Sequence, residues 1–320
     1  MTSLVRRERL LTLVVAQVID HVLGEPPPAV HPVVWIGALA ATMERCVRVT
    51  DPTPQLAAGA ALVGVVVGTA SATAALAEVV LGRLPLGPRI LLRAVLLKPT
   101  FAVRELLVAA ERVRVPLATG ELDAARAALR DLVSRDATSL DAGLVSAAAI
   151  ESLAENASDS IVAPWLAFVV AGLPGAYAYR AVNTLDAMVG YHGRYEYLGK
   201  PAARCDDLLN VVPARLTAVL LIAGAARDGT AQTAWRTTLR DHVATASPNA
   251  GWPMAAMAGA LQVRLEKIDH YVLGGDFRPP GAADIGTAGH LISRLATVAG
   301  WGLVLVGLCG IRSLRQQGDA

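Results

Sequence analysis

The sequence has few charged and few aromatic residues for its length of 320 residues. Charged residues make up 18% and aromatic residues 4%, while 54% of the chain is hydrophobic. An average soluble domain carries about 25% charged residues, so this composition favours a chain with a large apolar surface. The apolar residues are mainly Ala, Val and Leu, which suit helices better than strands. A net charge of +2 is too small to indicate nucleic-acid binding.

Cysteine is also scarce. Cys46, Cys205 and Cys309 lie far apart and form no CxxC pair, which argues against a zinc site, an iron–sulfur cluster and a disulfide framework. The sequence lacks a P-loop, a GxGxxG turn, an HExxH helix and a GxSxG elbow. A nucleotide would therefore have to bind through a carboxylate-held metal ion and scattered Arg or Lys side chains.

Long apolar segments indicate a membrane protein. Residues 56–81 contain one charge, Glu78, and at about 1.5 Å per residue they can cross a hydrocarbon core of about 30 Å. We predict an all-α, multi-pass integral membrane protein that forms a single membrane-embedded domain over residues 1–320. The predicted spans are residues 10–24, 56–81, 161–182, 208–226 and 291–311.

Residues 83–160 form a polar, basic segment between two of these spans. Amphipathic helices are expected over residues 89–115 and 119–150, and the positive-inside rule places them in the cytoplasm. Prolines break the chain at residues 25–32 and 51–54. No alternation of Val, Ile or Thr predicts a sheet.

The span at residues 161–182 poses a problem, because Pro174 and Gly175 lie in its middle. Each apolar half reaches only about 18 Å at helical rise, which is too short for a crossing. Two alternatives are open: a re-entrant hairpin with protein packed around its turn, or one kinked helix. A hairpin would bring Asn183 and Asp186, which follow it, to the same face as Glu155 and Asp159, which precede it.

Three carboxylates stand four residues apart just before this span: Glu151, Glu155 and Asp159. On a helix they form one acidic stripe, with Asn156 beside it. Like charges at this spacing cost roughly a few tenths of a kcal/mol per pair, which a bound cation would offset. The stripe indicates metal-assisted chemistry on a polar substrate at the edge of a membrane, with these three carboxylates as candidate metal ligands.

A second polar segment, residues 183–215, mixes acids, amides and cations. Such a mixture suits a phosphate substrate and its Mg²⁺, because magnesium prefers one or two carboxylates together with substrate oxygens. The alternative is a solvated loop whose charges pair with one another. Asp206 and Asp207 are candidate metal ligands. The other candidate site residues of this segment are Asn183, Asp186, Arg194, Lys200, Arg204, Asn210 and Arg215.

Two further polar residues belong to short motifs. Asn249 lies in SPNAGWPMAAMAGAL and is a candidate for substrate contact, although an N-cap is the simpler interpretation. His31 lies in HPVVWIG and is a candidate base or phosphate contact, although a histidine between prolines is more often a structural hydrogen-bonding group.

These motifs, in this order, resemble the CobD/CbiB family of cobalamin biosynthesis proteins. The motifs are HPVVWIG, ESLAENASDSIVAPW, NTLDAMVGY, ARCDDLLNVVPARLTA and SPNAGWPMAAMAGAL. The resemblance begins near Asp20 and covers nearly the whole chain. Small departures from the family pattern at Ala157, Ser160 and Leu198 concern packing more than charge.

The resemblance implies an ATP-dependent amide ligase, with adenosylcobinamide-phosphate synthase activity, in the cell membrane. It would join aminopropanol, or aminopropanol phosphate, to a propionate carboxylate of the corrinoid adenosylcobyric acid. A carboxylate must first be phosphorylated or adenylated, which requires Mg²⁺ on the nucleotide, and the ammonium nucleophile must lose a proton. Glu155, Asp159 and Asp186 are then the expected catalytic residues, and the order of their roles is open. Expected partners are membrane lipid and other cobalamin-pathway enzymes, without nucleic acid.

Two other classes of membrane protein fit part of the pattern. A transporter would also carry ionisable residues at membrane depth, but here the acids cluster at the ends of the spans. A Mg²⁺-dependent transferase acting on prenyl or alcohol phosphates would usually show paired DxxxD motifs, and DDLLN has no second copy. The ligase therefore accounts for more of the motifs than either alternative.

Overall fold

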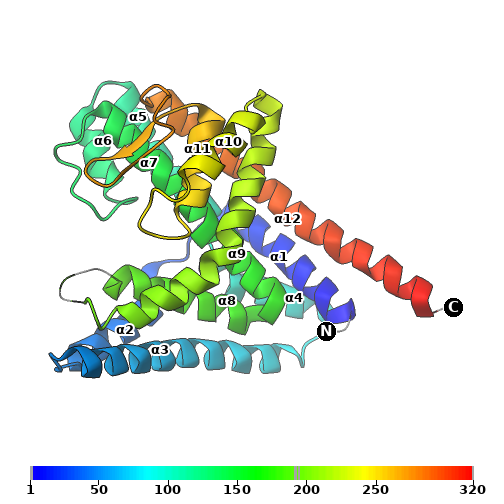
Figure 1. Cartoon of the computed structure of the whole chain (residues 1–320). Coiled ribbons are helices and arrows are strands. Elements are labelled where there is room, and N and C mark those ends of the chain that lie inside the picture. The colour runs from blue at the N-terminus through cyan, green and yellow to red at the C-terminus, as the bar shows by residue number, and fades with distance from the viewer. Residues whose placement is uncertain (1–2, 191–192, 194, 319–320) are drawn as a thin grey trace. The chain divides into compact units, whose positions relative to one another are not determined.

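The structure of the chain is a computed structural model that describes residues 3–190, 193 and 195–318, with the backbone alone at residues 3, 4, 6, 301 and 303–318. Helices dominate the described residues, and one β-hairpin joins them (Figure 1). The helices are α1 (Ser3–Leu23), α2 (Pro32–Cys46), α3 (Pro52–Leu81), α4 (Leu86–Leu97), α5 (Val103–Ala118), α6 (Leu122–Leu129), α7 (Ala142–Ala157), α8 (Ala163–Val189), α9 (Lys200–Ala225), α10 (Ala231–Asp241), α11 (Gly251–Leu261) and α12 (Ala282–Gly318). The strands are β1 (Leu265–Lys267) and β2 (Tyr271–Leu273). Short 3₁₀ turns occupy Pro28–Val30, Lys98–Thr100 and Ala226–Asp228, and a π-helical turn, Ser158–Val162, separates α7 from α8.

The chain forms two compact units, each built from segments that are distant in sequence. The first unit contains Met1–Ala102, Ala163–Leu209 and Gly300–Ala320, and the second contains Val103–Val162 and Asn210–Ala299. The single membrane-embedded domain over residues 1–320 stays a prediction.

Three helical stretches of the described chain are long and apolar enough to cross a membrane. They are Pro52–Leu81, Ala142–Val189 and Lys200–Asp228. They contain the spans predicted at residues 56–81, 161–182 and 208–226. The spans predicted at residues 10–24 and 291–311 fall on α1 and α12, which are helical but are not among these three.

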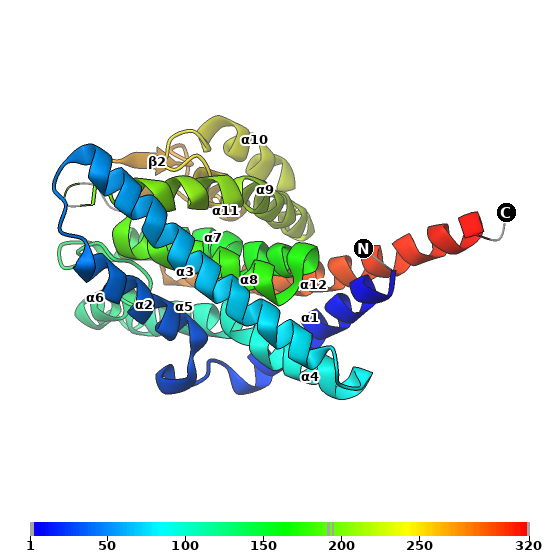
Figure 2. The same ribbon diagram turned by 90° about the horizontal axis from the view of Figure 1, so that it is seen from below.

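Helix α8 forms the centre of the first unit, and α1, α2 and α3 pack against it (Figure 2). Trp165, Phe168 and Leu185 of α8 are almost fully buried. Helices α2 and α3 both begin at a proline, which suits the first turn because its missing N–H has no helical acceptor there. The predicted breaks at residues 25–32 and 51–54 are thereby confirmed.

The backbone of α8 is interrupted at Gly172, where φ is 72° and ψ is −159°. Pro174 follows and cannot donate a helical hydrogen bond. A Cβ on Gly175 would lie 2.5 Å from the carbonyl oxygen of Ala167, although residues eight apart on a straight helix are about 12 Å apart. The two halves of α8 therefore meet at a sharp bend where the sequence predicts a break. The path of this bend through a membrane stays a prediction.

Two charged side chains form hydrogen bonds with the backbone groups that the interruption at Gly172 leaves without helical partners. Arg9 of α1 donates to the carbonyl oxygens of Val169 and Val170 at 2.9 and 2.8 Å, and Glu78 of α3 accepts from the Leu173 N–H at 3.3 Å. Both charges are also favourably placed for the helix dipoles. Arg9 lies at the negative C-terminal end of the first half-helix, and Glu78 lies at the positive N-terminal end of the second. Ion pairs of 2.6–2.9 Å connect α1 and α3 to α4. Arg93 of α4 pairs with Glu78 and Glu8, and Arg89 of α4 pairs with Glu8.

Helix α7 forms the core of the second unit. Val145, Ile150 and Leu153 are fully buried, and α5, α6, α11 and β1 all pack against α7. Asp141 caps the N-terminus of α7, because its Oδ1 accepts the Leu144 N–H at 2.8 Å. The small residues of this helix permit close packing on several sides.

Both predicted helices of residues 83–160 are interrupted. The helix expected over residues 89–115 breaks at Lys98–Thr100, where Pro99 supplies no N–H. The helix expected over residues 119–150 ends at Leu129 and starts again only after Asp141. Periodicity alone missed that Asp141 favours a new N-cap over a continued helix.

The conformation of Gly172 generates a prediction. Its φ and ψ lie in a region that glycine alone adopts readily, and a Cβ there would lie 3.1 Å from Oε1 of Glu78. Gly172→Ala should destabilise the protein by about 1–3 kcal/mol, seen as a lower Tm in detergent. Gly68→Ala is the matched control, because Gly68 is helical with open space around it. Equal melting temperatures for the two variants would show that the bend is not fixed.

Candidate functional site

The acidic stripe begins on the core helix α7 and ends in the π-helical turn. Glu151 is buried, Glu155 is exposed and Asp159 is half-buried. Asn156 is held by its neighbours, since its Nδ2 donates to the Ser152 carbonyl at 3.0 Å and its Oδ1 accepts from Ser160 at 3.0 Å. Insertions of π-helix are frequent at functional sites, and this one lies directly beside the stripe.

A polar cavity of about 180 Å³ opens beside Glu151 and Glu155 in the second unit. We call it the stripe cavity. Its walls come from α7, from the loop at residues 132–135 and from the β-hairpin. The polar residues that line it are Ser134, Arg135, Glu151, Ser152, Glu155, Asn156, Lys267 and Tyr271.

An ion pair forms the inner wall of the stripe cavity. Nη2 of Arg135 lies 3.1 Å from Oε2 of Glu151, whose side chain is 7% exposed. Oε1 of Glu151 and Nε of Arg135 are buried without a hydrogen-bond partner. Ser152 fixes the loop that carries Arg135, because its hydroxyl donates to the Leu132 carbonyl at 2.9 Å. A buried donor and a buried acceptor thus remain unsatisfied on one wall.

The β-hairpin supplies the opposite wall, and the sequence analysis missed it. Strands β1 and β2 pair antiparallel with Lys267 opposite Tyr271, which brings both side chains to the cavity. The turn between them contains Asp269 at a φ of 61°, a conformation for which Asp is better suited than most residues. Asp269 between two short apolar runs was the available signal.

The cavity environment disfavours an ionised Tyr271. Burial raises the pKa of its hydroxyl well above the usual range, and the carboxylates of Glu151 and Glu155 raise it further. Tyr271 is therefore a hydrogen-bond donor at any physiological pH. Its hydroxyl can donate to the carboxylate of Glu151 beside it, and it lies 3.9 Å from the Sδ of Met254, a weak acceptor.

The first unit carries most of the candidates of residues 183–215. Asn183 lies between Arg180 at 3.2 Å and Asp206 at 3.5 Å. Asp186 and Asp207 are half-buried, and Arg204 is exposed. Lys200 lies 4.0 Å from Glu196 and 5.8 Å from the centre of the Tyr197 ring. Arg194 lies outside the described residues.

Two of the predicted binding residues of the second unit contact each other. Nη1 of Arg215 donates to Oδ1 of Asn249 at 2.5 Å, and the guanidinium lies 4.8 Å from the centre of the Trp252 ring. His242 also packs against Trp252, and the centres of the two rings are 4.0 Å apart. Asn210 is buried. Asn249 therefore binds a cation of its own chain.

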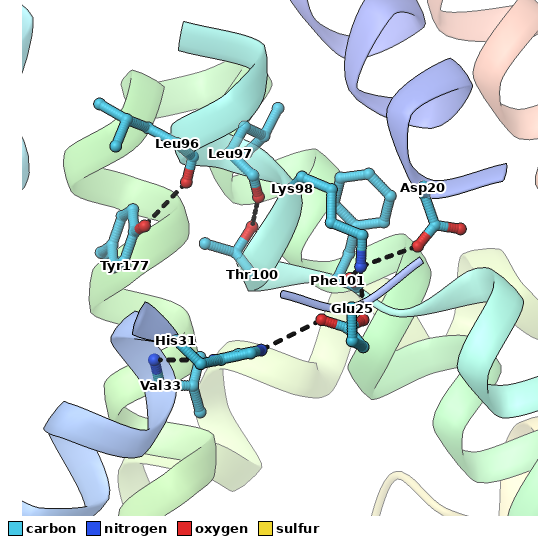
Figure 3. A network of polar contacts seen from close by, with 10 residues as sticks. All are labelled: Asp20, Glu25, His31, Val33, Leu96, Leu97, Lys98, Thr100, Phe101 and Tyr177. Atoms are coloured by element: carbon cyan, nitrogen blue, oxygen red, sulfur yellow. Dashed lines mark hydrogen bonds and ion pairs between the residues drawn. The ribbon is translucent and has the colours of Figure 1, made fainter. Parts of the chain in front are cut away.

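His31 belongs to a buried charge network of the first unit (Figure 3). Its Nδ1 accepts the Val33 N–H at 3.2 Å, which makes it the N-cap of α2, and its Nε2 lies 3.1 Å from Glu25. Lys98 is 2% exposed and bonds both Glu25 and, at 2.9 Å, Asp20. Burial raises the pKa of Glu25, but the bonds from His31 and Lys98 outweigh it and lower that pKa overall. The sequence analysis named His31 alone.

The expected return of Asn183 and Asp186 to the same face as Glu155 and Asp159 stays a prediction. Glu151, Glu155 and Asp159 belong to the second unit, while Asp186, Asp206 and Asp207 belong to the first. Within the part of the chain that the structure describes, no three His, Cys, Asp or Glu side chains gather closely enough to hold a metal ion.

Comparison with known proteins identifies the family. A family model described as CobD/Cbib protein matches residues 13–296. The chain belongs to the CobD/CbiB family. A cobalamin biosynthesis protein CobD of Dehalococcoides mccartyi is 42% identical over 302 residues, 94% of this chain and 97% of the relative. A cobalamin biosynthesis protein CobD of Rhodobacter capsulatus is 40% identical over 92% of this chain and 95% of the relative. A probable cobalamin biosynthesis protein CobD of Pyrococcus furiosus is 40% identical over 86% of this chain and 90% of the relative. No solved structure matches.

The Lys98 network generates a prediction. Lys98 pairs with the buried Asp20 and with Glu25, and breaking a buried ion pair by removing one partner costs about 3–5 kcal/mol. Lys98→Met should therefore lower the Tm strongly, whereas Lys200→Met, at a side chain that is 47% exposed, should change it little. Similar melting temperatures for the two variants in detergent would contradict this account of the network.

The lowered pKa of Glu25 sets the pH dependence of the same network. Its carboxylate contributes stability above its unfolded pKa of about 4.3, and this contribution is lost as the pH falls through the folded pKa. Glu25→Gln should lower the Tm near pH 7 and reduce the fall of Tm between about pH 5 and 3. A Tm profile in this range parallel to that of the wild type would count against the assignment.

Proposed function

We propose that the chain is an ATP-dependent amide ligase of cobalamin biosynthesis. It joins aminopropanol, or aminopropanol phosphate, to a propionate carboxylate of adenosylcobyric acid. The observation that carries the proposal is the stripe cavity, where two carboxylates and two cations of a CobD/CbiB family member line one small polar space. The curated relatives named above, which are cobalamin biosynthesis proteins, support the pathway.

The reaction needs a group that accepts the proton of the ammonium nucleophile. Glu155 lies at the exposed side of the stripe cavity, where a proton can leave to solvent, and Glu151 lies four residues earlier at its inner wall. A positioned carboxylate base contributes about 10²–10⁴-fold to the rate. We assign this role to Glu155, because it is exposed at the mouth of the cavity whereas Glu151 is buried.

The corrinoid carboxylate must be activated by phosphoryl or adenylyl transfer from ATP before the amine attacks. Mg²⁺ on the nucleotide would neutralise the developing phosphate charge. The carboxylates of the described residues fit an ion of this kind, since Mg²⁺ needs only one or two of them beside phosphate oxygens and water. In the second unit Glu155 and Asp159 are the carboxylates near the cavity that can provide such ligands. The alternative ligands, all in the first unit, are Asp186, Asp206 and Asp207.

A reconstituted assay tests the proposal. Purified protein in detergent, given adenosylcobyric acid, aminopropanol phosphate and MgATP, should form the amide with consumption of ATP. Glu155→Gln should lower kcat by about 10²-fold or more while the protein still folds, because the amide keeps the shape and loses the charge. Glu111→Gln is the matched control at an exposed carboxylate that pairs with Arg114. Amide formation without nucleotide, or an unimpaired Glu155→Gln, would refute the mechanism.

We further propose that the chain spans the cell membrane several times, with residues 83–160 in the cytoplasm. The three apolar helical stretches support membrane insertion, and the basic character of the segment supports its side. The bend at Gly172 is the place where a re-entrant hairpin would turn.

Cysteine labelling tests the cytoplasmic location. Asp123 is suitable because its side chain is 94% exposed. In a background with Cys46, Cys205 and Cys309 replaced by Ser, Asp123→Cys should react with an impermeant maleimide only after the cells are permeabilised. The cysteine-free parent is the control for background labelling. Equal labelling of intact and permeabilised cells would show that this segment lies outside the cytoplasm and would contradict the proposed topology.

A further inference from the structure

The size of the stripe cavity limits what it can hold. Its volume of about 180 Å³ lies below the roughly 300–1,000 Å³ of sites for drug-sized ligands. A nucleotide or a corrin ring exceeds this volume. The cavity is therefore suited to a molecule of a few heavy atoms.

The charges of the cavity limit its ligand further. Four ionisable side chains line it besides Tyr271, two cations and two anions: Arg135, Lys267, Glu151 and Glu155. Acidic and basic side chains are equal in number here, so the cavity has partners for both an anionic and a cationic group. A small molecule with an ammonium group at one end and a phosphate at the other has a partner for each charge.

The buried, unsatisfied atoms point to the same kind of ligand. Oε1 of Glu151 is an acceptor and Nε of Arg135 is a donor, and neither has a partner. Leaving such a group unsatisfied costs about 1–3 kcal/mol. The Glu151 side chain is more than nine-tenths buried, so its orphan oxygen is a second indication of a ligand besides the cavity.

We propose that the stripe cavity binds the amino alcohol substrate in its phosphorylated form, with Arg135 and Lys267 facing the phosphate and Glu151 and Glu155 facing the ammonium. Lys267 and Arg135 are then the residues that select the phosphate over the free alcohol. Tyr271 lies opposite Lys267 in the hairpin and can donate to the same phosphate. ATP and the corrinoid bind outside this cavity. This inference rests on the proposed function for the identity of the ligand.

Direct binding to the full chain in detergent tests the inference without turnover. Aminopropanol phosphate should bind in the absence of ATP and corrinoid, and more tightly than either aminopropanol or propyl phosphate. Lys267→Gln should weaken this binding on the order of tenfold or more and leave the affinity for aminopropanol unchanged. Lys267→Arg should restore part of the loss. Arg130→Gln is the matched control, because Arg130 is exposed and does not line the cavity.

Arg135 needs a separate design, because its loss would leave the buried Glu151 without its ion-pair partner. The double variant Arg135→Gln with Glu151→Gln removes both charges together and should also weaken binding of aminopropanol phosphate. If Lys267→Gln and the double variant bind the ligand as the wild type does, the inference is overturned.

Steady-state kinetics separates this inference from the proposed function. Lys267→Gln should raise KM for aminopropanol phosphate and leave KM for MgATP and for the corrinoid unchanged. A raised KM for MgATP alone would make the cavity a nucleotide site and overturn the inference, while the ligase function would stand. Tight, Lys267-dependent binding without any amide product would overturn the ligase function and support the cavity assignment.

Discussion

An interrupted helix in an apolar unit must find partners for the backbone groups that the interruption releases. The first unit depends on how this is solved at Gly172. Arg9 and Glu78 arrive from α1 and α3, cap the two half-helices of α8, and are joined to α4 by Arg93. Unsatisfied N–H and C=O groups cost several kcal/mol each in lipid, so these side chains make the bend compatible with a membrane. They also fix four helices to one point of the chain.

The same physical requirement applies to the buried charges of the second unit. Glu151 is buried in the core helix and its charge is balanced by Arg135, yet one oxygen and one nitrogen of the pair stay unsatisfied. In the first unit, by comparison, Lys98 binds two acids at once. Both units therefore place a cation beside a buried carboxylate.

Much of the architecture follows from apolar length and proline position, and these are visible in the sequence. The helical class, three helices long and apolar enough to cross a membrane, and the break near Pro174 could be predicted in this way. The β-hairpin could not be found from alternation, because each strand has only three residues and its fixing signal is one Asp at positive φ. Glu151 and Glu155 were found as a helical stripe, whereas Arg135, Lys267 and Tyr271 come from distant segments that only tertiary packing brings to them. For the same reason His31 was recognised without Lys98 and Asp20.

The stripe cavity suggests a division of labour in which a small zwitterionic nucleophile is held apart from the large activated partner. Binding the amine between paired charges would keep it oriented while its carboxylate partner is activated elsewhere, which limits hydrolysis of the activated species. The most direct measurement is an experimental structure of the full chain with aminopropanol phosphate bound. The account predicts its phosphorus beside Arg135 and Lys267 and its nitrogen beside Glu151 and Glu155. Ligand density elsewhere, with the cavity filled by water alone, would contradict it.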